Sequence, residues 1–148
     1  MTALHLRPAT RAEAPRLAEL RVAAMRPSLE AIGRFDPERA RTRFLDSFDP
    51  GATQVCLVGG AVAGFLVLRV RPDHLYLDHL YLAPAHQGCG LGRAAVEHAK
   101  DRARSAGLPL RLMALRGSPA NDFYRAQGFR QTGEEPLDIL YEWTPGPA

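Results

Sequence analysis

Three glycines alternate with other residues at positions 88, 90 and 92, directly after a strand-like segment and directly before a helix-like one. Glycine lets the backbone adopt positive φ and approach a ligand closely. The free N–H groups at the start of the helix then point into the loop, and the helix dipole favours a negative charge there. Residues 87–92, called the glycine loop below, therefore predict a cradle for a phosphate or pyrophosphate group.

The spacing of the glycine loop separates it from two common phosphate-binding motifs. A P-loop needs G-x-x-x-x-G-K-[ST], and no lysine follows these glycines. A dinucleotide fingerprint needs G-x-G-x-x-G, and Arg93 stands where its third glycine would be. The pattern present is Q-x-x-G-x-G, formed by Gln87, Gly90 and Gly92. A nucleotide is therefore disfavoured as the ligand.

Hydrophobic periodicity and turn residues predict alternating strands and helices along the chain. Strands are expected over residues 4–7, 54–58, 61–70, 74–82, 110–115, 129–132 and 138–143. Helices are expected from near Pro15 and over 37–48, 91–106 and 120–127, with a capping box at Thr10–Glu13 and a loop over 26–35. We predict one α/β (mixed α+β) domain over residues 1–148: a mixed, mostly antiparallel sheet of about seven strands with roughly four helices on both faces.

Composition and charge exclude several other classes. Of 148 residues, 46% are hydrophobic and 24% charged, as in a soluble globular protein rather than a disordered or fibrous one. No apolar run could span a bilayer and no signal pattern begins the chain, so we expect a cytoplasmic protein without a membrane partner. The net charge of +3 is not gathered into a basic block, so no nucleic-acid partner is expected. Cys56 and Cys89 form no metal-binding or disulfide pattern, and we expect no metal.

Two segments carry a family resemblance. The Q-x-x-G-x-G pattern between a strand and a helix resembles the coenzyme A pyrophosphate motif of the GNAT N-acetyltransferase superfamily. Residues 118–129 resemble the superfamily's N-P-A-x-x-hydrophobic-Y-x-x-x-G-F segment, with Ser118 where asparagine is usual. The matching positions of this second segment are Ala120, Phe123, Tyr124, Gly128 and Phe129. The resemblance implies a bacterial-type N-acetyltransferase that moves an acetyl group directly from acetyl-CoA, its co-substrate, to a primary amine of a small molecule, peptide or protein.

The resemblance also implies which residues hold the coenzyme. Backbone groups of Leu80, Tyr81 and Leu82 would hydrogen-bond the pantetheine arm and the acetyl carbonyl. Amides of the glycine loop and the helix start would hold the pyrophosphate, from Gln87, Gly88, Cys89, Gly90, Leu91, Gly92 and Arg93. Ser118 or Asn121 would replace the contact that the usual asparagine makes with pantetheine.

Three residues are candidates for the proton transfers. The Tyr124 phenol, with an ordinary pKa near ~10, suits a general acid for the departing thiolate, and its alternative role is a half-buried packing ring. Asp78 and His79 interrupt an apolar strand, and either would take a proton from an ammonium group. Strand alternation places them on opposite faces unless a bulge intervenes. Their alternative role is a structural Asp–His pair.

The sequence leaves two further alternatives open. The second interpretation of the whole chain is a non-catalytic acyl-CoA sensor or interaction module on the same fold. Two features favour it: Ser118 departs from the motif, and segment 110–115 holds no carboxylate that could act as a base. Cys89 is a candidate nucleophile, although its place among pyrophosphate donors favours a bystander. The acceptor and the oligomeric state, including a homodimer, are left undecided.

Overall fold

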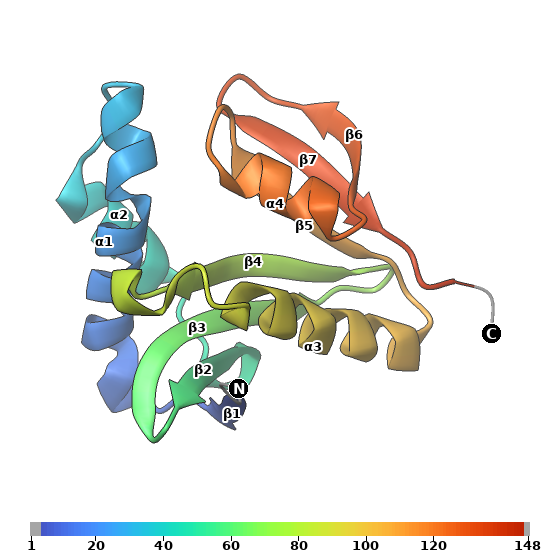
Figure 1. The fold of residues 1–148 in the computed structure, drawn as a ribbon, viewed down its shortest axis with the longest axis horizontal. Coiled ribbons are helices and arrows are strands. Elements are labelled where there is room, and N and C mark those ends of the chain that lie inside the picture. The colour runs from blue at the N-terminus through green and yellow to red at the C-terminus, as the bar shows by residue number, and fades with distance from the viewer. Residues whose placement is uncertain (1–3, 147–148) are drawn as a thin grey trace. The chain divides into compact units, whose positions relative to one another are not determined.

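The computed structural model describes residues 4–146, which form seven β-strands, four α-helices and three short 3₁₀ turns (Figure 1). The strands are β1 (His5–Pro8), β2 (Thr53–Val58), β3 (Ala61–Val70), β4 (Leu75–Leu82), β5 (Leu110–Leu115), β6 (Arg130–Glu134) and β7 (Asp138–Trp143). The helices are α1 (Ala14–Ala31), α2 (Pro37–Asp46), α3 (Leu91–Ala106) and α4 (Ala120–Ala126).

All seven strands join one sheet in the order β1-β2-β3-β4-β5-β7-β6. The pairs β1–β2, β2–β3, β5–β7 and β6–β7 are antiparallel, and β4 pairs with β5 in parallel. Gly59 and Gly60, with φ of 56° and 83°, make the two-residue turn between β2 and β3 that their sequence predicts. The predicted fold class, a mixed and mostly antiparallel sheet with four helices, is confirmed.

The described residues divide into two compact units. The first unit contains the chain up to Val67 together with His79–Ala95, and thus the glycine loop. The second unit contains Leu68–Asp78 and the chain from Val96 onward, and thus the segment around Tyr124.

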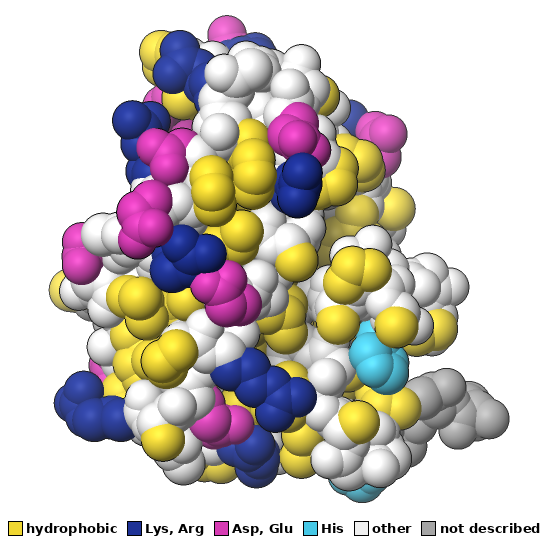
Figure 2. Space-filling view, turned by 90° about the vertical axis from the view of Figure 1, so that its left-hand side faces the viewer, with side chains coloured by type: hydrophobic (Ala, Val, Ile, Leu, Met, Phe, Trp, Pro, Cys, Tyr) yellow, Lys and Arg dark blue, Asp and Glu magenta, His cyan; other side chains and the backbone are white. Residues whose placement is uncertain are grey.

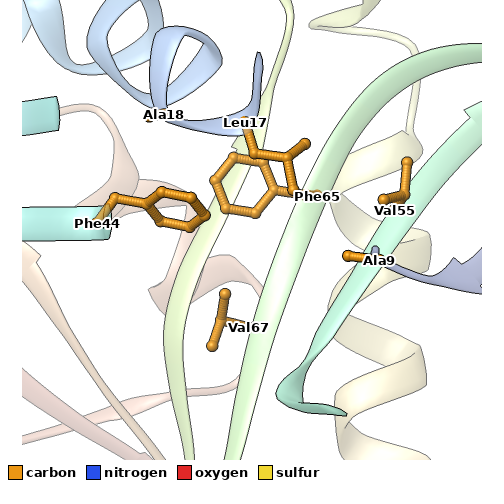
Figure 3. Packing of buried hydrophobic residues seen from close by; sticks show 7 residues of the cluster. All are labelled: Ala9, Leu17, Ala18, Phe44, Val55, Phe65 and Val67. Carbon is orange, nitrogen blue, oxygen red and sulfur yellow. The ribbon is translucent and has the colours of Figure 1, made fainter. Parts of the chain in front are cut away.

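The core of the first unit lies between helices α1 and α2 and the strands β2 and β3. The Phe44 ring of α2 meets the Phe65 ring of β3 edge-on, with centroids 5.1 Å apart. Burying a phenylalanine side chain stabilises a fold by ~1.5–3 kcal/mol, so this pair fixes α2 on the sheet. Figure 3 shows the seven buried residues of the cluster: Ala9, Leu17, Ala18, Phe44, Val55, Phe65 and Val67.

The predicted capping box precedes α1. The Thr10 N–H donates to Glu13 Oε1 at 2.9 Å, and Arg7 donates to both Glu13 oxygens at 2.8 and 2.7 Å. The hydrogen bond from Arg7 is the main cause that lowers the pKa of Glu13 to about 2. The capping box opens a 3₁₀ turn, and the regular helix starts at Ala14 with Pro15 in its first turn.

The predicted loop over residues 26–35 is wrong in its first half, because α1 continues through Pro27 to Ala31. A proline inside a helix removes one backbone donor and costs ~3 kcal/mol, so sequence alone favours a helix end there. Two interactions support the extra turn: Arg26 pairs with Glu30 at 3.2 Å, and Met25 accepts a hydrogen bond from the Tyr81 hydroxyl at 3.3 Å. The loop that remains is short and turns at Gly33, with φ of 68°.

A glycine of β3 determines how closely β3 approaches the end of β4. A Cβ at Gly64 would lie 2.2 Å from the Tyr81 carbonyl oxygen and 2.8 Å from a Leu82 methyl carbon. We expect Gly64→Ala to destabilise the protein by at least ~1–3 kcal/mol, because backbone atoms must move to admit the methyl group. Thermal unfolding measures the effect. The matched control is Gly133→Ala in β6, whose Cβ would meet its nearest neighbour at 3.9 Å, and equal losses in the two variants would contradict the prediction.

The second unit buries the chain's single lysine. Lys100 of α3 is only 7% exposed, and its ammonium group donates to the Gln127 carbonyl at 2.5 Å. It lies 5.2 Å from the centroid of the Trp143 ring and 6.0 Å from that of the Phe129 ring. Cation–π attraction and a carbonyl acceptor therefore replace the water that an exposed lysine would have.

Candidate coenzyme site

The glycine loop has the backbone conformation that its sequence predicts at two of three glycines. Gly88 and Gly90 have φ of 78° and 85°, a region that other residues rarely adopt. No atom lies within 4 Å of a Cβ built at either position, so both glycines face open space. Gly92 differs, because it lies in the first turn of α3 and has ordinary helical φ.

Side-chain contacts fasten the glycine loop to the end of β4. The Gln87 amide nitrogen donates to the Leu82 carbonyl at 3.0 Å, and Cys89 Sγ donates to the His86 carbonyl at 2.9 Å. The Ala94 N–H donates to the Gly90 carbonyl as α3 begins. The preceding N–H groups, from Leu91 to Arg93, have no carbonyl within the helix to bond. The loop therefore presents a group of backbone donors at the positive end of a helix dipole.

Residues of β4 alternate between a buried and a half-buried face up to His79, as predicted. His79 is 5% exposed, and its ring centroid lies 5.5 Å from that of Phe44 and 5.7 Å from that of Tyr81. Asp78 has the opposite orientation, and its Oδ2 lies 2.9 Å from Arg69 Nε. Asp78 thus forms an ion pair with Arg69 of β3, and the structural Asp78–His79 pair stays an untested alternative.

In the second unit, Tyr124 is more deeply buried than the half-buried position expected for it. It is 8% exposed, and its ring meets those of Phe123 and Phe129 edge-on, with centroids 5.1 and 5.6 Å away. Aromatic contacts of this geometry hold a ring in one orientation. A phenylalanine at this position would therefore keep the same packing.

Asn121 and Ser118, the two candidates for the pantetheine contact, have different environments. The Asn121 amide nitrogen donates to the Leu115 and Ser118 carbonyls at 2.8 and 3.0 Å, and its oxygen accepts from the Tyr141 hydroxyl at 2.8 Å. Asn121 is buried and its side chain thus fastens the start of α4 to β5 and β7. Ser118 is half-buried and sits at the turn before α4.

The two cysteines are both reduced and have contrasting surroundings. Burial raises the pKa of the Cys56 thiol to about 12, so it stays protonated and unreactive. Cys89 is exposed in the glycine loop. Over residues 4–146, no group of three or more histidine, cysteine or acidic side chains is arranged to hold a metal ion. Within the same residues, no helix has the length and apolarity needed to cross a membrane.

Sequence reasoning missed two arginines that the structure makes prominent. Arg69 is the partner of Asp78, and Arg21 is buried in the first unit. Arg21 follows the buried Leu17 by four residues, so it lies on the apolar stripe of α1. A basic residue on such a stripe was the signal in the sequence that could have identified it.

The seven-stranded mixed sheet, with a strand that leads through a glycine loop into a helix, defines an α/β protein of the acetyltransferase class. The family model described as "Acetyltransferase (GNAT) family" matches residues 16–129. The chain belongs to this family.

Solved structures from three organisms share the fold. The PaiA N-acetyltransferase of Thermoplasma acidophilum, in complex with coenzyme A, has a TM-score of 0.81 and 16% identity, over 97% of this chain and 99% of that one. A GCN5-related N-acetyltransferase of Rhodopseudomonas palustris has a TM-score of 0.79 and 21% identity, over 98% of both chains. An acetyltransferase of Thermus thermophilus has a TM-score of 0.72 and 27% identity, over 97% of both.

One relative is similar in sequence over a shorter stretch. The peptidyl-lysine N-acetyltransferase YjaB of Escherichia coli (strain K12) is 32% identical over 77 residues, which are 52% of this chain and 48% of that protein. The chain thus matches about half the length of this relative.

Proposed function

We propose that this protein is an acetyl-CoA-dependent N-acetyltransferase that transfers acetyl directly to a primary amine. The observation that carries the proposal is the glycine loop, with positive φ at Gly88 and Gly90, directly before the first turn of α3, whose N–H groups have no partner within the helix. Membership of the GNAT family supports it, as does the coenzyme A complex of the Thermoplasma protein with the same fold.

The first unit supplies the groups that would bind the coenzyme. N–H groups of the glycine loop and of α3 up to Arg93 would hold the pyrophosphate, where the helix dipole favours negative charge. Because Gly88 and Gly90 lack side chains, the phosphates can approach the backbone closely. Gln87 would keep the loop in place through its bond to Leu82. Backbone groups of Leu80 to Leu82 would orient the pantetheine arm and the thioester.

Ser118 is the better candidate for the remaining pantetheine contact. Both polar atoms of the Asn121 side chain are already engaged with Leu115, Ser118 and Tyr141. Turning Asn121 toward a ligand would break these buried bonds, at a cost of roughly 1–3 kcal/mol for each group left unsatisfied. The Ser118 hydroxyl can rotate towards a ligand at little cost.

The chemistry needs alignment and proton transfers. A neutral amine attacks the thioester carbonyl, the C–S bond breaks, and the thiolate leaves with a proton from the Tyr124 phenol. The attacking nitrogen loses one proton as the amide forms, and this proton, passed through water, would restore the phenol. The ammonium form of the acceptor must first lose a proton. We assign this role to Asp78, whose side chain is 29% exposed, ahead of His79, which lies deep among aromatic rings.

Release of the coenzyme thiol from acetyl-CoA in the presence of a panel of primary amines tests the proposal. We expect thiol release that depends on the amine, with an acetylated product of the matching mass. A non-catalytic sensor would instead bind acetyl-CoA, raise the melting temperature, and release no thiol with any amine. No thermal shift with acetyl-CoA would refute both functions.

Cys89→Ala should keep most of the activity. The proposed transfer is direct, so only the backbone N–H of Cys89 takes part, and among residues 4–146 its thiol bonds only the His86 carbonyl. We expect kcat/KM within about tenfold of the wild type, because an exposed neutral hydrogen bond contributes ~0.5–1.5 kcal/mol. Steady-state thiol release measures this. An acetyl group trapped on Cys89, together with loss of turnover in Cys89→Ala, would replace direct transfer by an acyl-enzyme.

A further inference from the structure

Arg21 is a buried cation between α1, α2 and β4. It is 5% exposed, its Nη1 donates to the Ala40 carbonyl at 2.6 Å, and its guanidinium carbon lies 5.8 Å from the Tyr81 ring centroid. Arg21 Nε is fully buried without a hydrogen-bond partner, and Nη2 likewise has none among residues 4–146. One whole edge of the guanidinium, Nε with Nη2, is therefore unused by the chain.

This unused edge has the geometry of a carboxylate-binding fork. Arginine binds a carboxylate through two parallel N–H groups, most often in a planar bidentate arrangement. The neighbouring helix gives an internal comparison: the same Nε–Nη2 edge of Arg41 is occupied by both carboxylate oxygens of Glu19. Arg21 has an equivalent edge with no acidic partner.

The lack of an acidic partner is unusual because of where Arg21 lies. Two other arginines of α1 and α2 have such partners: Arg26 pairs with Glu30, and Arg41 also pairs with Glu38. Figure 2 shows basic and acidic side chains side by side on the left-hand side of Figure 1, where α1 and α2 lie. Buried charges normally require pairing, because desolvation without a partner costs several kcal/mol. Arg21 is buried and, unlike Arg26 and Arg41, has no carboxylate partner among residues 4–146.

The position of Arg21 also links it to the site of transfer. Tyr81, whose ring it faces, belongs to the segment of β4 proposed to orient the thioester. The Tyr81 hydroxyl donates to Met25, one turn further along α1, so α1 crosses β4 at this point. An acceptor amine that reaches the acetyl carbonyl would bring its remaining atoms close to α1.

We propose that Arg21 binds a carboxylate of the amine acceptor, so that the acceptor class is an amine that also carries a carboxylate, such as an amino acid. The inference rests on the proposed function. The acid's two oxygens would accept from Nε and Nη2 once the side chains that cover Nε move aside, while Nη1 keeps its bond to Ala40. A simple alkylamine would leave this edge of Arg21 unpaired and would therefore be acetylated with a lower kcat/KM.

Matched acceptors test the inference. Free amino acids and their carboxamides, such as glycine and glycinamide, present the same primary amine with and without a carboxylate. We expect the wild type to favour the acid of at least one such pair by ~10–100-fold in kcat/KM. Arg21→Met should reduce this acid-to-amide ratio of kcat/KM to near the ratio of the rates at which the two amines react with acetyl-CoA without enzyme. The two amines of a pair differ in pKa, but this difference is the same for the wild type and for Arg21→Met. Comparing the acid-to-amide ratio between the two proteins therefore removes its effect.

Three controls separate binding from structure. Arg41→Met removes an exposed arginine of the neighbouring helix and should leave the acid-to-amide ratio unchanged. Arg21→Met should keep the thermal shift with acetyl-CoA, and its own melting temperature should be unchanged or raised, because a buried unpaired charge is replaced by an apolar side chain. Arg21→Lys, which keeps the charge without the fork, should give an intermediate ratio and serves if the methionine variant does not fold.

Each outcome decides between the inference and its rivals. A lower melting temperature in Arg21→Met with an unchanged ratio would make Arg21 a structural clamp only. Turnover without any preference for acids would overturn the inference and leave the proposed function intact, whereas no thermal shift with acetyl-CoA would reject the proposed function itself. If no acceptor of the panel reacts, thermal shifts of the coenzyme A-loaded protein with N-acetylglycine and N-acetylglycinamide decide. Equal shifts, or none, overturn the inference.

Discussion

Gly90→Asp should abolish the rise in melting temperature that acetyl-CoA gives the wild-type protein. Gly90 has φ of 85° and faces open space, so a side chain there would project from the loop without displacing other protein atoms. A carboxylate at this position would repel the pyrophosphate and occupy its place. At 100 times Kd a ligand stabilises a protein by ~2.7 kcal/mol, which corresponds to roughly 5–10 °C for a chain of this size.

Gly60→Asp is the matched control for this experiment. Gly60 has nearly the same φ, 83°, and likewise no atom within 4 Å of a built Cβ, but it lies in the β2–β3 turn. Both variants carry similar backbone strain and the same added charge. We expect Gly60→Asp to keep the full thermal shift. A shift of wild-type size in Gly90→Asp would mean that the pyrophosphate binds elsewhere.

Tyr124→Phe should lower kcat by ~10²–10⁴-fold, the usual loss when one positioned proton donor is removed. The ring packs edge-on against Phe123 and Phe129, and phenylalanine would keep both contacts. Melting temperature and affinity for acetyl-CoA should therefore change little. Thiol release at saturating substrate, together with thermal shifts, measures the two effects separately. A fully active variant would make the phenol structural and solvent the source of the thiolate's proton.

Asp78→Asn should differ from Tyr124→Phe in its pH profile. If Asp78 takes a proton from the ammonium form of the acceptor, its loss matters less as pH rises towards the amine's pKa, ~10.4 for a lysine-like amine. The acceptor then arrives already neutral. Tyr124→Phe should show no such recovery at high pH. Parallel profiles for the two variants would remove Asp78 from this role and leave His79 or a water chain.

The elements that sequence predicts best are those with strong local signals at both ends. The predicted ranges 91–106, 110–115 and 138–143 coincide with α3, β5 and β7. Gly107, with φ of 66°, ends α3 as expected of a glycine after a helix. The error at Pro27 has the opposite origin, because contacts from distant residues such as Tyr81 support a helix that local preference would end.

The same distinction applies to the candidate site. The glycine loop was predictable because its conformation depends on residues adjacent in sequence. The partner of Asp78 was not, because Arg69 comes from another strand and no local rule connects the two. The engagement of Asn121 by Tyr141, twenty positions away, escaped prediction for the same reason. The roles assigned to these residues in catalysis remain predictions.

The buried Lys100 has a consequence for self-modification. An enzyme that uses acetyl-CoA keeps an acylating reagent bound beside its own surface, and exposed lysines there would become targets. This chain has no lysine other than Lys100, whose ammonium group is held by the Gln127 carbonyl beneath the Trp143 ring. Apart from its histidines, its other basic side chains are arginines, which carry charge without offering a nucleophilic amine. These 148 residues therefore present no exposed lysine side chain on which acetylation could accumulate, and a lysine substrate would lie outside them.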